Sequence, residues 1–524
     1  MATLAMVSTS CSDSFLESDP IMQETEATFY NTDDQMFKAL MGAYDVLQLR
    51  GGQPLSAQIA FGEVRSDNAR TGGGGNTDQP DLQKIEAFTN TEVNTISDAI
   101  WKRLYQGVYR ANLVINAEFD SEATKIYKAE AKFLRAWYHF DLLRTYGPCV
   151  ISLETVYPDG HTFERSTRAE VNAQITKDLE EAIPVLLPEH SDQMKGRITK
   201  YAAEALLAKV LIYQADWNND DAATFKKAIP LLEDIINSGK YQLFTDYSKL
   251  FIEFSENNSE SLFEVQRTSK SGWTNWGNSE ASEGSITFTF MGPRGLTPNH
   301  PVYYDGYGFV LPSKSTVDYF LPEDTERLKA YILTKEALEE GTDTKGKPNK
   351  WNISQYGGTP ETAGGLADFQ GYASKKYAGR KAYEIIGNLA LNRTVNERMI
   401  RYAEVYLLLA EAELRGNGNE AKAKEYLNTL RASRGQSDVN TMMSKYSSRF
   451  SSVLDCLWYE RRVELMGEGD RWYDLVRSGR AKEVMAPHIM KEYGTAWEDK
   501  FIYLPIGSIE IDNSKGSLTP YPNE

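Results

Sequence analysis

The residues that most often carry enzymatic chemistry are few in this chain, and they show none of the common catalytic spacings. The five histidines are His139, His161, His190, His300 and His488, and none belongs to an H-E-x-x-H zinc motif. No G-x-S-x-G sequence marks an exposed nucleophilic serine. A glycosidase needs only two carboxylates, so an all-helical glycoside hydrolase or lyase stays open as an alternative function.

Phosphate and metal chemistry have no clear motif either. The glycines at 72–75 are not followed by Gly-Lys-Ser or Gly-Lys-Thr, so we interpret this run as a flexible loop and not as a phosphate-binding loop. Cys149 and Cys456 are far apart and lack metal-ligand spacing, which favours buried free thiols. We therefore expect no cofactor and no metal site.

The charge of the chain narrows the choice of partner. Its 524 residues carry 57 basic and 74 acidic side chains, which gives a net charge of −17. Nucleic-acid binding needs clustered Lys and Arg, and adhesion to an anionic membrane needs a basic surface. No apolar run approaches the roughly 18 residues of a membrane-spanning helix. An uncharged partner is the class that this composition leaves unaffected.

A dense charged run at 460–477 could be read as acid–base machinery or as structure. Glu468 and Arg471 are three residues apart, as are Asp474 and Arg477, and such pairs are neighbours on a helix. Close Glu–Arg pairing keeps a carboxylate ionised and unsuited to act as an acid. We therefore favour an ion-pair network that clamps two helices across Gly467 and Gly469.

Helical periodicity dominates both ends of the chain. Apolar positions recur at helical spacing in segments around 100–115, 133–143, 171–179, 203–211, 225–236, 400–414 and 423–430. Thr167 and Glu170 form a capping-box pattern, and Gly147-Pro148 and Gly239 supply stop signals. Helix pairs with small residues at their contacts predict a mainly α fold with a tetratricopeptide-like scaffold.

The middle of the chain, about 251–392, has a different pattern. It is rich in Gly, Ser, Asn, Thr and aromatic residues and has weak periodicity, with short strands expected at 261–266 and 285–290. Gly292-Pro293 and Gly357-Gly358 punctuate it as loops. This predicts an irregular, loop-rich region inserted between two helical parts.

Several segments, taken in order, resemble the SusD/RagB family of outer-membrane nutrient-binding lipoproteins. They lie at 130–136, 146–148, 178–182, 200–203, 239–241, 246–251 and 400–408, and most specifically at 460–465 and 468–477, with Tyr-Leu-Pro-Ile at 503–506. The similarity covers nearly the whole chain. It departs at the C-terminus, where Gly507 stands in place of a second proline.

The resemblance implies a function and a set of partners. It implies a surface lipoprotein that captures an oligosaccharide or polysaccharide for nutrient uptake, performs no catalysis and delivers the glycan to a SusC-like TonB-dependent transporter in the outer membrane. The expected organisation is a signal remnant and tether at 1–20, a helical part at 21–250, a ligand-presenting insert at 251–392, and a second helical part at 393–524 packed with the first. A helical-repeat scaffold that binds another protein is a further alternative.

Cys11 fits the anchoring that this resemblance implies. It follows a short apolar stretch and the small residues Ser8, Thr9 and Ser10, and a polar segment comes after it. This order is typical of the end of a bacterial lipoprotein signal, although no Lys or Arg precedes Cys11. We expect Cys11 to be lipidated.

Aromatic residues in loops are the strongest candidates for sugar binding. Flat pyranose faces pack on aromatic rings, while hydroxyls hydrogen-bond to polar side chains. Trp101, Trp137 and Trp472 lie on helix faces and are assigned to packing, whereas Trp273 and Trp276 stand in a polar, glycine-containing loop.

Two further pairs complete the candidate glycan site. Tyr304 and Tyr307 belong to a second aromatic cluster near Pro301. Asp67 and Asn68 occupy a polar loop where, by the resemblance, ligand contacts are placed. The predicted glycan-binding residues are thus Trp273, Trp276, Asp67, Asn68, Tyr304 and Tyr307.

Overall fold

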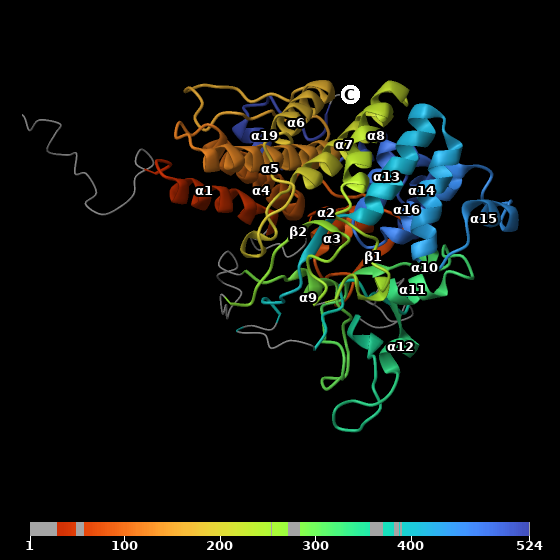
Figure 1. Cartoon of the computed structure of the whole chain (residues 1–524). Helices are drawn as coiled ribbons and strands as arrows, with labels where there is room; N and C mark the ends of the chain where they lie inside the picture. The colour runs from red at the N-terminus through yellow and green to blue at the C-terminus, as the bar shows by residue number, and fades with distance from the viewer. Residues whose placement is uncertain are drawn as a thin grey trace, which may run out of the picture.

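The described chain is mainly helical, as predicted. The computed structural model describes residues 29–48, 57–252, 254–270, 283–356, 370–381, 387 and 390–522, with 57–60 described by their backbone alone. Within these residues the strands form small two-stranded sheets. Helices gather in one layer, and the loop-rich middle of the chain lies beneath them in the view of Figure 1.

The first helical part places long helices side by side. Its helices are α1 (Asp33–Asp45), α2 (Ala57–Val64), α3 (Pro80–Glu86), α4 (Thr95–Ile115), α5 (Glu122–Tyr146), α6 (Arg168–Ala182), α7 (Lys200–Trp217) and α8 (Ala222–Asn237). α4 packs on α5, α5 on α6, and α7 on α8. Successive helices that pack as hairpins confirm the tetratricopeptide-like scaffold.

Local capping explains where the main helices begin and end. Ser121 and Thr124 form a reciprocal capping box at the start of α5, with N···O distances of 3.1 and 2.7 Å. Thr167 and Glu170 do the same for α6, as the sequence predicted. Gly147 ends α5 with a φ of 75°, a conformation that costs glycine little.

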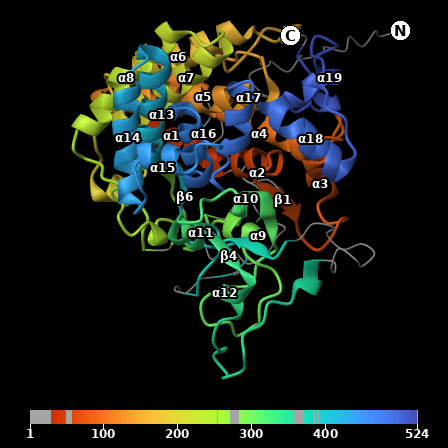
Figure 2. The same cartoon turned by 90° about the vertical axis from the view of Figure 1, so that its right-hand side faces the viewer.

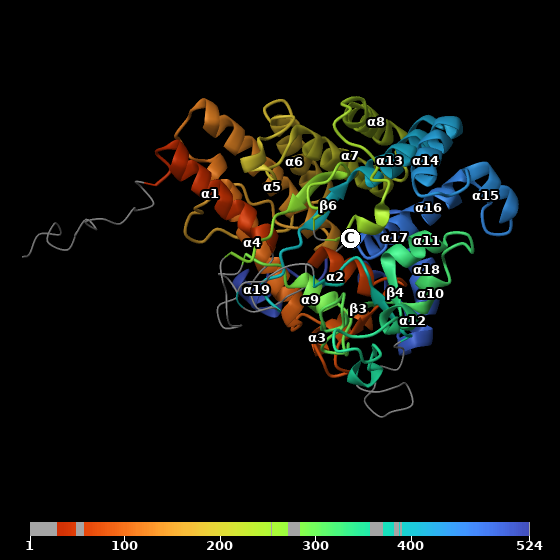
Figure 3. The ribbon, with the colours of Figure 1, turned by 60° about the horizontal axis from the view of Figure 1, so that its bottom comes forward.

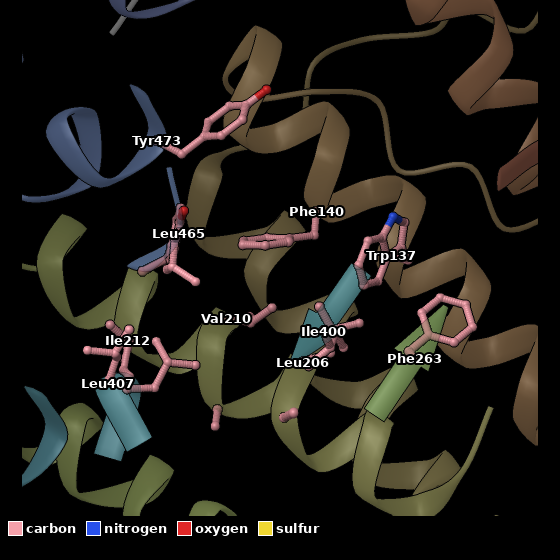
Figure 4. Packing of buried hydrophobic residues seen from close by; sticks show 14 of the residues in the cluster. Trp137, Phe140, Leu206, Val210, Ile212, Phe263, Ile400, Leu407, Leu465 and Tyr473 are labelled. Carbon is pink, nitrogen blue, oxygen red and sulfur yellow. The ribbon is translucent and has the colours of Figure 1, made fainter. Parts of the chain in front are cut away.

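The second helical part continues the same layer. Its helices are α13 (Tyr402–Ala412), α14 (Glu420–Ser433), α15 (Val439–Lys445), α16 (Val453–Glu464), α17 (Asp470–Arg477), α18 (Ala481–Tyr493) and α19 (Ser508–Asn513). α13 packs on both α7 and α8. Figure 4 shows the core that results, in which Phe140 of α5, Val210 of α7 and Leu407 of α13 come together with the strand residue Ile400. The N-terminal and C-terminal helices therefore share one hydrophobic core.

In the described part of the chain, three small antiparallel sheets tie distant segments together. β1 (Ala69–Gly72) pairs with β3 (Phe309–Pro312), β2 (Ser261–Val265) with β6 (Glu397–Arg401), and β4 (Ile332–Thr334) with β5 (Tyr372–Ser374). The strand predicted at 261–266 is therefore confirmed as β2. β1 belongs to the N-terminal part and β3 to the middle of the chain, so this sheet joins the helical layer to the loop-rich layer.

The loop-rich layer has short elements and a small core of its own. Its helices are α9 (Thr287–Met291), α10 (Lys314–Val317), α11 (Thr325–Tyr331) and α12 (Lys335–Glu339). Leu296, Leu338, Trp351 and Tyr356 are buried together in a cluster separate from the main core. Figures 2 and 3 show α9 and α12 on the side of the molecule opposite α8 and α14.

Two sequence predictions of secondary structure are wrong. The segment 285–290 forms a single bridge at Ser285, paired with Arg393, and then helix α9 instead of a strand. The hydroxyls of Ser285 and Thr287 both donate to Glu397, at 2.9 and 2.6 Å, and these two bonds fix the local path. The second helical part, predicted from 393, begins with a strand, and its first helix starts only at Tyr402, because 397–401 pairs with β2.

A buried ion network connects the two layers, and we call it the central ion network. Its carboxylates are Glu260, Asp324, Glu460, Glu464 and Glu468, and its cations are Arg327, Lys376, Arg401, Arg431 and Arg434. The side chains of Glu464 and Arg434 are 0% exposed. Equal numbers of acids and bases leave this buried group electrically balanced, which a low-dielectric interior requires.

The charged run at 460–477 is structural, as predicted, but the predicted ion pair between Glu468 and Arg471 does not form. Arg461 of α16 contacts Asp474 of α17 at 2.7 Å, so the run does clamp two helices, and Asp474 also pairs with Arg477 at 2.9 Å. Glu468 lies in the turn before α17 and therefore does not face Arg471. It contacts Arg401 and Lys376 instead, each at 2.7 Å.

Length and hydropathy decide whether a helix can cross a bilayer. Among the residues that the structure describes, none of the helices combines the length and the apolar character that a membrane crossing requires.

Candidate functional site

The β1–β3 sheet positions two of the predicted site segments. Asp67 and Asn68 directly precede β1, and Tyr304 and Tyr307 precede β3. Because the strands are antiparallel, Ala69 faces Pro312 and Gly72 faces Phe309. The two pairs of residues therefore lie at opposite ends of the sheet, separated by roughly four residues of strand at about 3.4 Å each. The structure joins these segments through one sheet but does not bring the two pairs into contact.

Asp67 is buried in ion pairs. Its carboxylate accepts from Arg471 at 2.8 Å and lies 2.9 Å from Arg462, and its side chain is 12% exposed. Burial alone would raise the pKa of Asp67, but Arg462 and Arg471 outweigh burial and hold the pKa well below its usual range. The carboxylate is therefore ionised and already occupied by two arginines.

Asn68 is also turned inward. Its amide donates to Glu63 at 3.2 Å, and its carbonyl oxygen accepts from Arg462 at 2.9 Å. Asp67 and Asn68, predicted as ligand contacts in a polar loop, are thus both buried, and their side chains bind residues of the helices behind β1. The role that this geometry supports for them is to position β1 and the loop that follows it.

The glycine loop after β1 has its own internal partner. Gly72, Gly73 and Gly75 have positive φ angles, and the amide of Gly74 donates to the carboxylate of Asp78 at 2.7 Å. A side chain at Gly73 would collide with the Phe309 ring, 2.4 Å from the Cβ position. A carboxylate of the chain itself occupies the amide that a phosphate loop would offer to its anion, and these contacts hold in place a loop that was predicted to be flexible.

Tyr304, Tyr307 and Arg294 are partly exposed, and Arg393 is buried behind the Tyr304 ring. The guanidinium of Arg393 lies 3.9 Å from the centre of the Tyr304 ring. Burial raises the pKa of Tyr307, opposed by the nearby charges of Arg294 and Arg393. We call these four residues, Tyr304, Tyr307, Arg294 and Arg393, the tyrosine–arginine patch.

Backbone hydrogen bonds hold the tyrosine–arginine patch in place. The amide of Tyr304 donates to Gly379 at 2.8 Å, and that of Tyr307 donates to Thr289 at 2.7 Å. Arg393 donates to the hydroxyl of Thr289 at 3.2 Å. Aromatic rings offer apolar faces, and guanidinium groups offer hydrogen-bond donors. The partly exposed rings of Tyr304 and Tyr307, together with Arg294, can therefore bind hydroxylated ligands.

The sequence analysis missed Arg294 and Arg393. Arg294 follows the Gly292-Pro293 turn and Arg393 lies far along the chain, so no periodicity or motif links either arginine to the tyrosines. The predicted aromatic cluster around Tyr304 was the only signal for this place in the fold.

Of the remaining residues singled out in the sequence, some are buried as predicted, and the others lie outside the described part of the chain. Trp101, Trp137 and Trp472 are buried, and so are the free thiols Cys149 and Cys456, as predicted. His139 is packed inside α5, and burial lowers its pKa to about 3. Trp273, Trp276 and Cys11 lie outside the residues that the structure describes.

Two family models match this chain. Residues 259–524 match the model described as the SusD family. Residues 14–212 match the model described as "starch-binding associating with outer membrane". The first match covers the loop-rich layer and the second helical part, and the second covers most of the first helical part.

Curated relatives align over most of the chain. A SusD-like protein of Bacteroides ovatus is 27% identical over 493 residues, which cover 91% of this chain and 81% of the relative. SusD-like protein P38 of Formosa agariphila is 27% identical and covers 91% of this chain and 90% of its own length. The similarity is thus spread along the chain and not confined to one motif.

Solved structures share the fold. A laminarin-binding SusD-like protein superposes with a TM-score of 0.78 at 28% identity, covering 94% of this chain and 100% of that one. Surface glycan-binding protein A from Bacteroides thetaiotaomicron superposes at 0.78 with 26% identity, covering 94% and 99%. The same protein in complex with laminarihexaose superposes at 0.77 with 25% identity, covering 93% and 99%.

Proposed function

Because the chain belongs to the SusD family, we propose that it captures an oligosaccharide at the cell surface, leaves it intact, and passes it to a TonB-dependent transporter of the outer membrane. The chain is a SusD-like glycan-binding protein and not an enzyme. Delivery to the transporter is the finer part of the proposal. It rests on the SusD/RagB resemblance.

One observation carries the proposal furthest. A structure described as a complex with laminarihexaose matches 93% of this chain at a TM-score of 0.77, and a second match is described as laminarin-binding. The partly exposed members of the tyrosine–arginine patch, Tyr304, Tyr307 and Arg294, add suitable chemistry, with rings for sugar faces and donors for hydroxyls. Laminarihexaose is therefore the first probe, and a glycan array extends the search to other sugars.

The predicted loop aromatics provide the direct test. Replacing both Trp273 and Trp276 by Ala is expected to weaken binding at least about fivefold, because an aromatic contact contributes about 0.5–1.5 kcal/mol beyond the area it buries. Wild-type affinity is expected between about 1 μM and 1 mM, as for surface sites that stack one or two rings. Calorimetry with the strongest array ligand measures both values.

A matched control removes an exposed ring elsewhere. Tyr109 lies on α4 and is 43% exposed, so Tyr109→Ala deletes a surface aromatic from the helical layer and should leave affinity unchanged. Full affinity in the double tryptophan variant would reject those two residues as the site. Failure of the wild type to bind any glycan on the array would reject the function itself.

The two alternative functions give different results in the same preparation. A glycoside hydrolase or lyase would shorten the bound sugar during prolonged incubation, and chromatography would detect the products. A protein-binding scaffold would purify from the native membrane with a protein partner and without affinity for sugar. Co-purification of a TonB-dependent transporter together with measurable glycan binding supports the delivery role.

Anchoring through Cys11 is a separate part of the proposal. Cys11→Ser in the full-length gene is expected to move the protein from the membrane fraction to the soluble fraction, because a lipid chain would lose its attachment point. Ser14→Ala changes a nearby residue and should leave the fractionation as it is. Membrane retention of the Cys11→Ser protein after detergent-free washing would contradict lipidation at this cysteine.

A further inference from the structure

Two cavities lie on either side of the segment 195–197, and neither is lined by the described glycan-site candidates Asp67, Asn68, Tyr304 and Tyr307. The larger has a volume of about 430 Å³ and lies between the end of α1 and strand β2. The smaller has a volume of about 280 Å³ and is lined by residues around Thr199, Tyr241 and Asn258. The larger volume falls within the roughly 300–1,000 Å³ of ordinary small-molecule sites.

The wall between the cavities is fixed by a glycine. Gly196 has a φ of 93°, and a Cβ atom there would lie 2.2 Å from Cγ of Gln266. Gln266 in turn exchanges two hydrogen bonds of 3.0 Å with Asn257 and accepts a third, also 3.0 Å, from Asn396. The backbone of 195–197 therefore rests directly on a fully hydrogen-bonded amide.

A buried carboxylate holds the other side of the same segment. Glu130, whose side chain is 0% exposed, pairs with Arg197 and accepts from the Tyr44 hydroxyl at 2.6 Å. The same hydroxyl accepts from the amide of Ile198 at 2.8 Å. α1, α5 and the segment 195–198 are thus joined at one point, and the Tyr44 ring is held as part of the cavity wall. Walls fixed in this way are pre-organised for a ligand.

The lining of the larger cavity combines apolar walls with neutral polar groups. The apolar residues are Met41, Tyr44, Leu47, Phe263 and Val265. The neutral polar residues are Gln48, Gln266 and Thr268. Aromatic and aliphatic walls with a few hydroxyl and amide groups are typical of sites for small polyhydroxylated molecules.

Most charged side chains around the cavities have an ion-pair partner, buried for Arg197, Glu264 and Arg267 and at the surface for Lys195 and Lys240. Ion pairs join Lys195 to Asp192, Arg197 to Glu130, Lys240 to Glu189, Arg267 to Glu397, Glu264 to Arg398 and Asp45 to Arg110. The carboxylate of Glu283 accepts from Gln48 at 3.2 Å. A charged ligand would have to compete with these internal partners, so the lining favours a neutral ligand.

From this geometry we propose that the larger cavity binds one neutral pyranose ring, as a second saccharide site whose lining includes none of the predicted site residues. The choice of a sugar among neutral polyhydroxylated molecules rests on the proposed glycan-binding function. A ring in the cavity would place one apolar face against Tyr44 and Met41 and direct hydroxyls toward Thr268. A second site on the same chain would let the protein hold two points of one glycan and so raise its effective affinity.

The test uses small sugars and a protein in which the loop aromatics are absent. Methyl glycosides of glucose, galactose and mannose are titrated onto the Trp273→Ala/Trp276→Ala protein by saturation-transfer NMR. At least one is expected to saturate with a dissociation constant of about 1–10 mM, the weak range expected of a single ring. The methyl glycoside of glucuronic acid, which is anionic, should show no saturation at the same concentration.

Tryptophan substitutions that fill the cavity from either wall test whether the sugar binds inside it. Met41→Trp, from α1, and Thr268→Trp, from the end of β2, should each abolish saturation, whereas Met41→Leu keeps the volume and should retain it. Melting temperatures near that of the parent protein establish that each variant is folded. Absence of saturation for all three neutral glycosides, or unchanged binding in both tryptophan variants, overturns the second site.

The experiments distinguish failure of the second site from failure of the proposed function. An inactive glycan array with the wild type would reject glycan capture, while saturation at this cavity would still stand. Conversely, strong array binding that is lost with Trp273 and Trp276, together with no saturation by the methyl glycosides, would keep the proposed function and reject the second site.

Discussion

Replacement of Glu464 by Gln is expected to lower the free energy of unfolding by about 3–5 kcal/mol, the cost of removing one partner from a buried ion pair. The Glu464 carboxylate lies 2.9 Å from Arg434, 3.3 Å from Arg401 and 3.4 Å from Arg327, all within the central ion network. Without its charge, these arginines stay buried with one carboxylate fewer. The midpoint of urea unfolding measures the effect.

The effect of Glu464→Gln should depend on pH. Burial raises the pKa of Glu464, but Arg434 and Arg401 outweigh it and hold the pKa well below the usual value. A depressed pKa in the folded state contributes stability that is present above the unfolded value of about 4.3 and is lost as pH falls toward the folded value. The difference between wild type and variant should therefore be full at pH 7 and shrink below about pH 4.

A matched control uses the same substitution at an exposed pair. Glu122 contacts Lys125 at 2.6 Å, but its side chain is 92% exposed, so Glu122→Gln should move the midpoint little. Equal midpoints for the Glu464 variant and the wild type at pH 7 would show that the central ion network contributes nothing to stability.

Gly62→Ala is expected to destabilise the protein by about 3 kcal/mol or more, the upper end of the range for overpacking. A Cβ atom at Gly62 would lie 1.7 Å from the carbonyl oxygen of Gly469. That turn cannot retreat freely, because the amide of Gly469 donates to Glu63 at 2.9 Å and Gly469 precedes α17 with a φ of 90°. α2 and the turn before α17 would have to separate.

The same substitution at Gly42 is expected to raise the free energy of unfolding instead of lowering it. Gly42 lies inside α1, and a Cβ atom there would meet nothing within 4 Å. Alanine in an open helical position stabilises by about 0.5–1 kcal/mol. Thermal and chemical unfolding of both variants should thus move in opposite directions. If Gly62→Ala lowers the free energy of unfolding no more than an ordinary surface substitution does, α2 can shift away from Gly469 without cost.

The sequence was most informative where a pattern is local. The apolar period identified α4, α5 and α7, and the Thr167 capping box marked the start of α6. It was misleading at 285–290, where alternating apolar residues indicated a strand but two hydroxyls bonded to Glu397 favour a turn into α9. At this segment, hydrogen bonds to a partner more than a hundred residues away outweigh the local preference for a strand.

In the candidate site, too, the sequence indicated the residues with a local pattern and missed those brought in by the fold. Tyr304 and Tyr307 were found from composition, whereas Arg294 and Arg393 join them only through the fold. Asp67 was noticed as a polar residue in a loop, but its true partners, Arg462 and Arg471, lie near the other end of the chain. Pairing between residues this distant leaves no spacing in the sequence that could be counted.

The central ion network also constrains the order in which the chain can fold. Its cations Arg327 and Arg401 are synthesised well before Glu464 and Glu468, and the chain leaves the ribosome from its N-terminus. All five cations precede Glu460, Glu464 and Glu468, so until these carboxylates emerge only Glu260 and Asp324 can balance them, and burying the network would leave uncompensated positive charge in a low-dielectric interior. The loop-rich layer can therefore dock onto the helices only late, after nearly the whole chain is available.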